Sequence, residues 1–438
     1  MAGYTIVSVA VNLQLAPSPI TRQQTGALVS QGGTTLSTGT YSLLTQLSDL
    51  TPLLAAPIAI TSLSWASGTV TATVPIMTTA VGTVFVVTVA GATPAGYNGT
   101  YMATVASSTT FTYAVTTNPG TETVPGTYTP PGQAELYSMA STFFGQGSTA
   151  SVYVLELGAG AATAGVTELN TFLTANPSFF YAYLVPRSWD GVSTFLSLIA
   201  NYESPEGLTY FFVTTTAATY TDYTALMKDV VALIESPNAP ASEFSLAAPF
   251  WNVINQVPSA TNKAAPFRNR FLYGVTPYPT VGNGALLTTY QTANVNTIGT
   301  GAEGGISAAV WWWGTTMDGN DFSFWYSVDW VQLNSAVMLA NAVINGSNNP
   351  QNPLYYDQFG INGLETVEID VMNSAAAFGM VNASTASVVS ATSFATYTQQ
   401  NPSNYAAGIY GGLSVEYTPS RGFAKIVLNI TVSQFPSG

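Results

Sequence analysis

The two ends of the chain show its clearest alternation of apolar and polar positions. Near the N-terminus, an apolar residue occupies every second position from Val7 to Leu15. Near the C-terminus the same period of two runs from Ala424 to Val432. Because successive side chains of a strand point to opposite faces, each end is predicted to form a β-strand with one apolar face.

The middle of the chain alternates strand-like runs with helical periodicity. The strand-like runs are Ser151–Leu157, Phe179–Val185 and Leu208–Val213. A helix is predicted after each of these runs. The first carries Val166, Leu169, Phe172 and Leu173 on one face. The second is capped by Asp190 and carries Val192, Phe195, Leu196 and Ile199; the third begins at Asp222 and carries Tyr223, Leu226, Val230, Leu233 and Ile234. Such alternation predicts a largely parallel sheet covered by helices.

A different texture separates this middle part from the N-terminal residues. Between Ile58 and Pro131 short β-type runs follow one another, with turn residues between them. They are Thr69–Val74, Thr83–Val89, Tyr101–Val105 and Thr110–Val115. Short strands at this even spacing predict a small β-sandwich or barrel.

The last third is predicted to open with a hairpin. Two β-like runs, Ile306–Trp313 and Phe322–Val328, flank the turn Met317–Asp321. A long helix should follow, because Trp330, Leu333, Val337, Ala340 and Ile344 step by three and four. Asp329 would lie at the positive end of that helix dipole. With the two preceding parts, the fold class is mixed α/β (α+β) and multidomain.

The charge content favours permanent assembly over a free monomer. Only 7% of the 438 residues are charged, against roughly 25% in an ordinary soluble domain. With 47% hydrophobic residues, the polar surface must consist largely of Thr, Ser, Asn, Gln and Gly, and neighbouring subunits would cover much of it. The net charge is −13 and the eight basic residues are scattered, so direct nucleic-acid binding is not expected.

Missing residue types restrict the chemistry. The chain has no cysteine and no histidine, which excludes disulfides, thiolate nucleophiles and Ser-His-Asp arrangements. Carboxylate chemistry stays open. The first residues lack a basic region followed by an apolar run, and no stretch of 18 apolar residues occurs, so neither a signal peptide nor membrane insertion is expected.

Three clusters are candidates for chemistry, and each has a plainer interpretation that we favour. Asp318-Gly-Asn-Asp321 resembles part of a calcium loop, but lacks the remaining ligands and reads as a turn. Glu365, Glu368 and Asp370 could act as paired carboxylates, yet a solvated charged helix face is commoner. Trp311–Trp313 and Trp325 could form a sugar-binding platform, although such residues usually fill a core or an interface. We therefore expect no catalytic, cofactor or metal site.

The terminal strands are the candidates for subunit contacts. Long apolar strand edges are an aggregation hazard unless they are paired. They could pair with each other within one subunit, or add to the sheets of neighbouring subunits. The residues expected to make such contacts are Val7, Val9, Val11, Ile426, Leu428, Ile430 and Val432.

Several segments together resemble the tail sheath proteins of contractile bacteriophages. Gly314–Trp330, which runs into an amphipathic helix, is similar to their "DG…D…DW" segment. Ala134–Gly147 before a strand, Asn294–Gly299 and Asn352–Ile361 resemble further sheath motifs in the same order. The resemblance covers residues 1–56 and 132–438.

This resemblance implies a domain plan and a set of partners. It implies an N-terminal arm (1–20), an α/β middle domain (21–56 with 132–300), an inserted β domain (57–131) and a C-terminal domain with a strand arm (301–438). It also implies a virion protein, assembled in the host cytoplasm, that forms stacked hexameric rings around a tail tube protein. Baseplate and tail terminator proteins would be its other partners, and contraction would drive the tube through the host envelope. Alternatives are a carbohydrate-binding adhesive protein, a carboxylate-based glycosidase of a tail spike, and a tail tube or capsid subunit.

Overall fold

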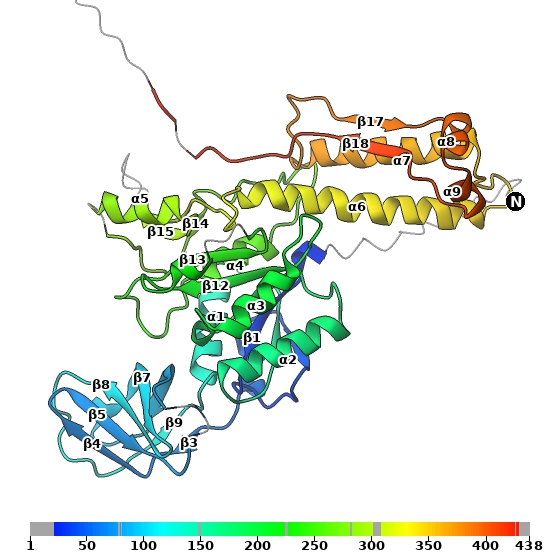
Figure 1. Ribbon diagram of the computed structural model, residues 1–438. Coiled ribbons are helices and arrows are strands. Elements are labelled where there is room, and N and C mark those ends of the chain that lie inside the picture. The colour runs from blue at the N-terminus through cyan, green and yellow to red at the C-terminus, as the bar shows by residue number, and fades with distance from the viewer. Residues whose placement is uncertain are drawn as a thin grey trace, which may run out of the picture.

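The computed structural model describes residues 22–77, 79, 81–147, 150–223, 227–280, 283–300, 308–424 and 426–428. Three parts are visible in Figure 1: a central helix-covered sheet, a β unit at one end, and a pair of long helices with a two-stranded sheet at the other. Of the helices described, none is both long and apolar enough to cross a membrane.

The central sheet has six strands in the order β13-β12-β11-β1-β10-β2. Its parallel strands are β1 (Gly26–Ser30), β10 (Val152–Glu156), β11 (Ala182–Leu184), β12 (Tyr210–Thr215) and β13 (Val230–Ile234). The edge strand β2 (Tyr41–Leu44) runs antiparallel to β10. The predicted parallel sheet, and the strands predicted at β10, β11 and β12, are confirmed.

Helices cover both faces of this sheet. On one face, α2 (Ala162–Ala175) and α3 (Ser193–Tyr202) bury apolar residues against odd-numbered positions of β1, such as Ala27 and Val29. On the other, α1 (Gln133–Phe144) and α4 (Ala247–Ile254) pack against Leu28. The predicted α2 and α3 are confirmed, with Val166, Leu169, Phe195 and Ile199 buried as expected.

The helix predicted from Asp222 is wrong. Tyr220–Tyr223 forms a 3-10 turn (η5), and Val230–Ile234 is the strand β13. All five residues of β13 are buried, so the segment has no polar face to reveal its period, as expected for a strand covered on both sides. Asp190 does not cap α3 either, because its carboxylate accepts hydrogen bonds from Thr219 and Tyr223 instead.

The β unit is a seven-stranded antiparallel sheet in the order β3-β9-β6-β7-β8-β5-β4. Its strands are β3 (Ile58–Ala59), β4 (Ser62–Ala66), β5 (Thr69–Thr73), β6 (Val84–Ala90), β7 (Gly99–Ser107), β8 (Thr110–Ala114) and β9 (Thr127–Tyr128). The predicted runs therefore form strands. They enclose a separate apolar core that includes Val70, Val87, Phe111 and Tyr128.

The predicted hairpin before the long helix is wrong in its second strand. A small sheet of β14 (Phe271–Leu272), β16 (Ala309–Trp312) and β15 (Thr297–Thr300) contains the first run. The second run, Phe322–Val328, is the first part of α6 (Phe322–Ser347). Aromatic and β-branched residues suggested a strand, but the side chain of Asp321 accepts from the Ser323 amide and caps a helix. Asp329 consequently lies inside α6 and not at its positive end.

The C-terminal part is built on α6 and α7 (Gln358–Ala377), which pack against each other. The strands β17 (Val388–Ala391) and β18 (Leu413–Glu416) form a two-stranded sheet, with β17 packed against α7. The remaining elements are α5 (Gly284–Thr292), α8 (Phe394–Gln400), α9 (Pro402–Ala406), and the 3-10 turns η1 (Arg22–Gln24), η2 (Leu47–Leu53), η3 (Ala95–Tyr97) and η4 (Arg187–Trp189).

Candidate assembly surfaces

The distal half of α6 exposes apolar side chains within a stretch of sequence that carries no charge. No charged residue occurs from Trp330 to Tyr356. Within this stretch Val337, Met338, Val343 and Ile344 are 39–59% exposed. Exposed apolar patches are typical of sites that contact another molecule, so this surface is a candidate subunit contact. The sequence feature that indicates this surface is the long interval without charged residues. Helical periodicity predicts the helix itself but does not show that its distal half is exposed and apolar.

A groove lies beside this half of α6. Its volume is about 750 Å³, and its walls come from α6, α7 and the chain around β18. The residues that line it are uncharged and include Leu339, Val343, Tyr356, Ile361, Leu364 and Tyr410. Such a groove suits apolar side chains of a protein partner better than a charged ligand.

The sheet of β17 and β18 offers strand edges. Within the described residues, each of these strands bonds to the other alone, over four residue pairs from Val388–Glu416 to Ala391–Leu413. Val388 is 54% exposed. A sheet with unpaired edges can accept an added strand through backbone hydrogen bonds.

Two of the predicted contact residues can be placed. Ile426 and Leu428 are 79% and 77% exposed, in an irregular segment that runs away from the body of the protein (Figure 1). Val7, Val9, Val11, Ile430 and Val432 lie outside the described residues. The pairing of the terminal strands, within or between subunits, therefore stays a prediction.

The acidic turn between β16 and α6 uses its carboxylates to hold the protein together. Asp318 accepts hydrogen bonds from Thr316, Asn320 and Trp325. Asp321 caps α6 and forms an ion pair with Arg268 at 3.2 Å. Gly319 has a φ of +84°, as a tight turn requires. The geometry is that of the turn that we favoured over a calcium loop.

The other two candidate clusters are also engaged in packing. Glu368 is 1% exposed and accepts from Ser335 of α6 at 2.7 Å, so the solvated charged face predicted for this cluster is wrong at Glu368. Asp370 lies on the exposed side of α7. Trp311 is fully buried and donates to Asn296, and the Trp325 ring lies over the Lys228 ammonium at 4.5 Å. The tryptophans thus do not form one shared platform.

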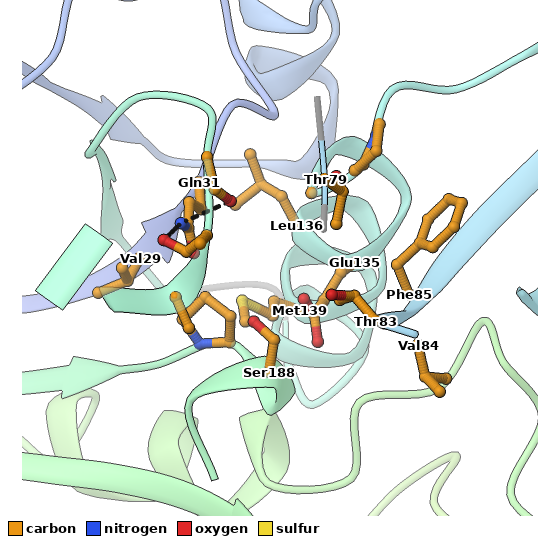
Figure 2. A pocket seen from close by; sticks show the side chains of 16 residues that line it. Val29, Gln31, Thr79, Thr83, Val84, Phe85, Glu135, Leu136, Met139 and Ser188 are labelled. Atoms are coloured by element: carbon orange, nitrogen blue, oxygen red, sulfur yellow. Dashed lines mark hydrogen bonds between the residues drawn. The ribbon is translucent and has the colours of Figure 1, made fainter. Parts of the chain in front are cut away.

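A cavity of about 120 Å³ lies where the β unit meets the central part (Figure 2). Thr83, Val84 and Phe85 of the β unit line it, opposite Gln31, Glu135 and Met139. Its main polar groups already have protein partners: Gln31 donates to the carbonyls of Gly160 and Ala161, and Glu135 accepts from the amide of Arg187. The cavity is therefore part of a joint between two packed units.

Comparison with known proteins identifies the fold. Neither a scan against protein-family models nor a search of curated proteins finds a match. A search of solved structures shows that the chain has the fold of a contractile helical sheath.

Three matched chains come from the anti-feeding prophage. A chain of its six-fold symmetrised baseplate aligns over 99% of this chain and 100% of its own, with a TM-score of 0.57 and 12% identity. A chain of its helical sheath in the contracted state aligns over 98% and 100%, with a TM-score of 0.54 and 11% identity. A chain of its contracted baseplate aligns over 99% and 100%, with a TM-score of 0.52 and 13% identity. At these identities the likeness establishes the fold.

Proposed function

We propose that the protein is a structural subunit of a contractile phage tail sheath. The observation that carries this proposal is the alignment with a contracted helical sheath over essentially the full length of both chains. The uncharged, exposed apolar surface of α6 supports it, because a subunit that is permanently assembled can cover such a surface. The proposed role is mechanical, with no catalytic step.

In this role the subunits form hexameric rings that stack helically around a tail tube protein. Head-to-tail contacts that do not close on themselves generate such helical tubes. Baseplate and tail terminator proteins bind the two ends of the sheath, which belongs to the virion and assembles in the host cytoplasm. Contraction then drives the tube through the host envelope during genome delivery, without direct contact between sheath and nucleic acid.

The terminal arms tether neighbouring subunits. Val7, Val9 and Val11, with Ile426, Leu428, Ile430 and Val432, pair between subunits, and the open edges of β17 and β18 are suitable acceptors. Each buried Val or Ile contributes roughly 1.5–3 kcal/mol, so a few such contacts hold a neighbour while the rest of the interface changes. The high exposure of Ile426 and Leu428 in a single subunit is the observation that favours an external partner.

Residues 57–131 form an inserted domain on the outside of the sheath in this proposal. The separate core of the β unit and its paired end strands β3 and β9 support independent folding. The rest of the chain is divided in this proposal as the sequence predicts. Residues 21–56 and 132–300 form the middle domain, and residues 301–438 form the C-terminal domain.

Negative-stain electron microscopy of the purified protein tests the function. We expect rings or tubes with six-fold symmetry. Removal of residues 1–12, or Leu428→Pro, should abolish tubes and leave circular dichroism and the melting transition unchanged. A protein that stays monomeric at high concentration would refute the sheath function. Normal tubes from the truncated protein would refute only the role of the arms.

A further inference from the structure

The attachment of α6 to the central sheet depends on a buried charge. Asp329 of α6 is 0% exposed, and its Oδ2 accepts hydrogen bonds from the hydroxyls of Tyr181 and Tyr210, each at 2.7 Å. Its Oδ1 lies 3.5 Å from the Lys228 ammonium. The residue before β11, the first residue of β12 and the chain before β13 thus all hold α6 at this one carboxylate.

Lys228 extends these contacts to a surface loop. Its ammonium donates to the carbonyls of Pro205 and Gly207 at 2.8 and 2.7 Å, and only 2% of the residue is exposed. The loop 203–209, which joins α3 to β12, is therefore bound to the same cation as α6. A shift of this loop would move Lys228 away from Asp329.

The neighbouring residue, Asp229, is a buried carboxyl that is 3% exposed. Among the residues that the structure describes, none donates a hydrogen bond to either of its oxygens. The side chain beside it is the carboxyl of Glu203, at the start of the loop, which accepts from the Asp229 amide at 3.2 Å. Burial, followed by the contact with Glu203, raises the pKa of Asp229 to about 9. A proton between the two carboxyls supplies the missing donor.

The other charges around this pair are mostly negative. Asp329 of α6, whose pKa is also raised by burial, pairs with the adjacent Lys228, and Glu206 lies in the loop itself. Asp318 belongs to the turn after β16, where the backbone amides of Asp318 and Met317 donate to the carbonyls of Met227 and Val230. The cations are Lys228 and, on the side of Asp329, Arg22 of η1, while Tyr181 and Tyr210 keep raised pKa values through burial and stay neutral. Few positive charges are therefore present to stabilise a second carboxylate beside Glu203.

We propose that the junction of α6 with the sheet is a proton-dependent latch, closed by the proton that Asp229 and Glu203 share. With the proton in place, the loop 203–209 and the start of β13 hold Lys228 on Asp329. Opening exposes Asp229 to water, where it loses the proton. Because opening releases a proton, rising pH favours the open state. This inference goes beyond the sheath function and does not require it.

The pH range follows from the two states of Asp229. In the open state its pKa returns to the ordinary value near 4, and in the closed state it is about 9. At pH values between these two pKa values, the closed state holds a proton that the open state has lost. In this range the equilibrium constant for opening rises up to about tenfold for each pH unit. Above pH 9 no further change is expected.

Hydrogen exchange followed by mass spectrometry tests the latch, with rates corrected for the intrinsic effect of pH. In the full chain we expect exchange of residues 203–209 and 322–331 to increase between pH 6 and pH 9. Asp229→Asn, which cannot ionise, should show no such increase. Glu203→Gln should also flatten the pH response, because the new side-chain amide can donate a hydrogen bond to an ionised Asp229. This second variant tests the latch if Asp229→Asn fails to fold. Asp370→Asn on the exposed side of α7 is the matched control and should behave like the natural protein.

Two results would overturn the latch. One is an unchanged pH response in both Asp229→Asn and Glu203→Gln. The other is a loss of protection on addition of EDTA at constant pH, because a bound cation, and not a proton, would then join the carboxyls.

Discussion

At the scale of single residues, several of the few charges form ion pairs that are partly or fully buried. Arg187 lies between Glu135 and Glu235, at 3.5 and 2.7 Å, and also stacks over Phe244. Lys228 and Asp329 form a further pair, which is fully buried. Removing one partner of such a pair leaves an uncompensated charge, which costs more than the pair itself contributes.

Asp329→Ala should therefore lower the free energy of unfolding by about 3–5 kcal/mol, because it removes the charge that pairs with Lys228 and the acceptor of the Tyr181 and Tyr210 hydroxyls. Denaturant unfolding measures this value. Asp370→Ala removes an exposed carboxylate of α7 and should change stability by less than about 0.5 kcal/mol. Equal effects of the two variants would show that the buried charge does not hold α6.

At the scale of elements, α6 shows how a local signal can be misread. Phe322, Tyr326 and Trp330 are buried at intervals of four, which is the spacing of one helix face. The same segment is rich in aromatic residues, which are common in strands, and the difference depends on the cap formed by Asp321. The strand interpretation gave weight to residue preference where the cap and the spacing were decisive.

A pair of variants separates the cap from the ion pair at Asp321. Asp321→Ala should destabilise the protein by about 1 kcal/mol or more through loss of the cap. Asp321→Asn retains the capping oxygen and loses the charge facing Arg268 and the acceptor of the Gly422 amide, so it should cost less than loss of the whole side chain. Thermal melting of both proteins gives the comparison. If the two variants melt together, the cap is not the main contribution of this side chain.

The exposed half of α6 gives a prediction about assembly. Ile344→Asp places a charge in the uncharged groove, at a side chain that is 59% exposed, so the isolated fold should hardly change. Polymerisation should fall sharply, because burial of an unpaired carboxylate at an interface costs several kcal/mol. Light scattering and sedimentation measure it. Asn341→Asp, on the same helix and outside the groove lining, is the control and should polymerise almost normally.

At the scale of the whole molecule, the sequence predicted the parts better than their contacts. Short apolar runs bounded by turn residues or by helical spacing revealed β10, β12 and the strands of the β unit. The uniformly buried β13 has no polar face, so its pattern did not distinguish strand from helix. The groove beside α6 combines residues from 339 to 413, and no local pattern can bring such distant positions together.

Excision of residues 57–131, with a short Gly/Ser linker in their place, should leave the central sheet and its assembly intact. The reason is that the β unit has its own core and meets the rest mainly through α1. Circular dichroism and electron microscopy of the shortened protein test this expectation. Aggregation or loss of the melting transition would mean that the joint at α1 is required for folding.

The pairing of β3 with β9 also affects how the chain reaches its native state. Strand β2 must find β10, which follows it by more than a hundred residues, and closing such a long flexible loop costs entropy. However, Ile58 pairs with Tyr128 at the base of the β unit, whose hairpins are mostly local in sequence. Once these hairpins form, the two ends of the β unit are adjacent. The loop that must close for β2 to pair with β10 is then much shorter. During synthesis on the ribosome, the β unit would thus fold first and hold β1 and β2 ready for the strands that emerge later.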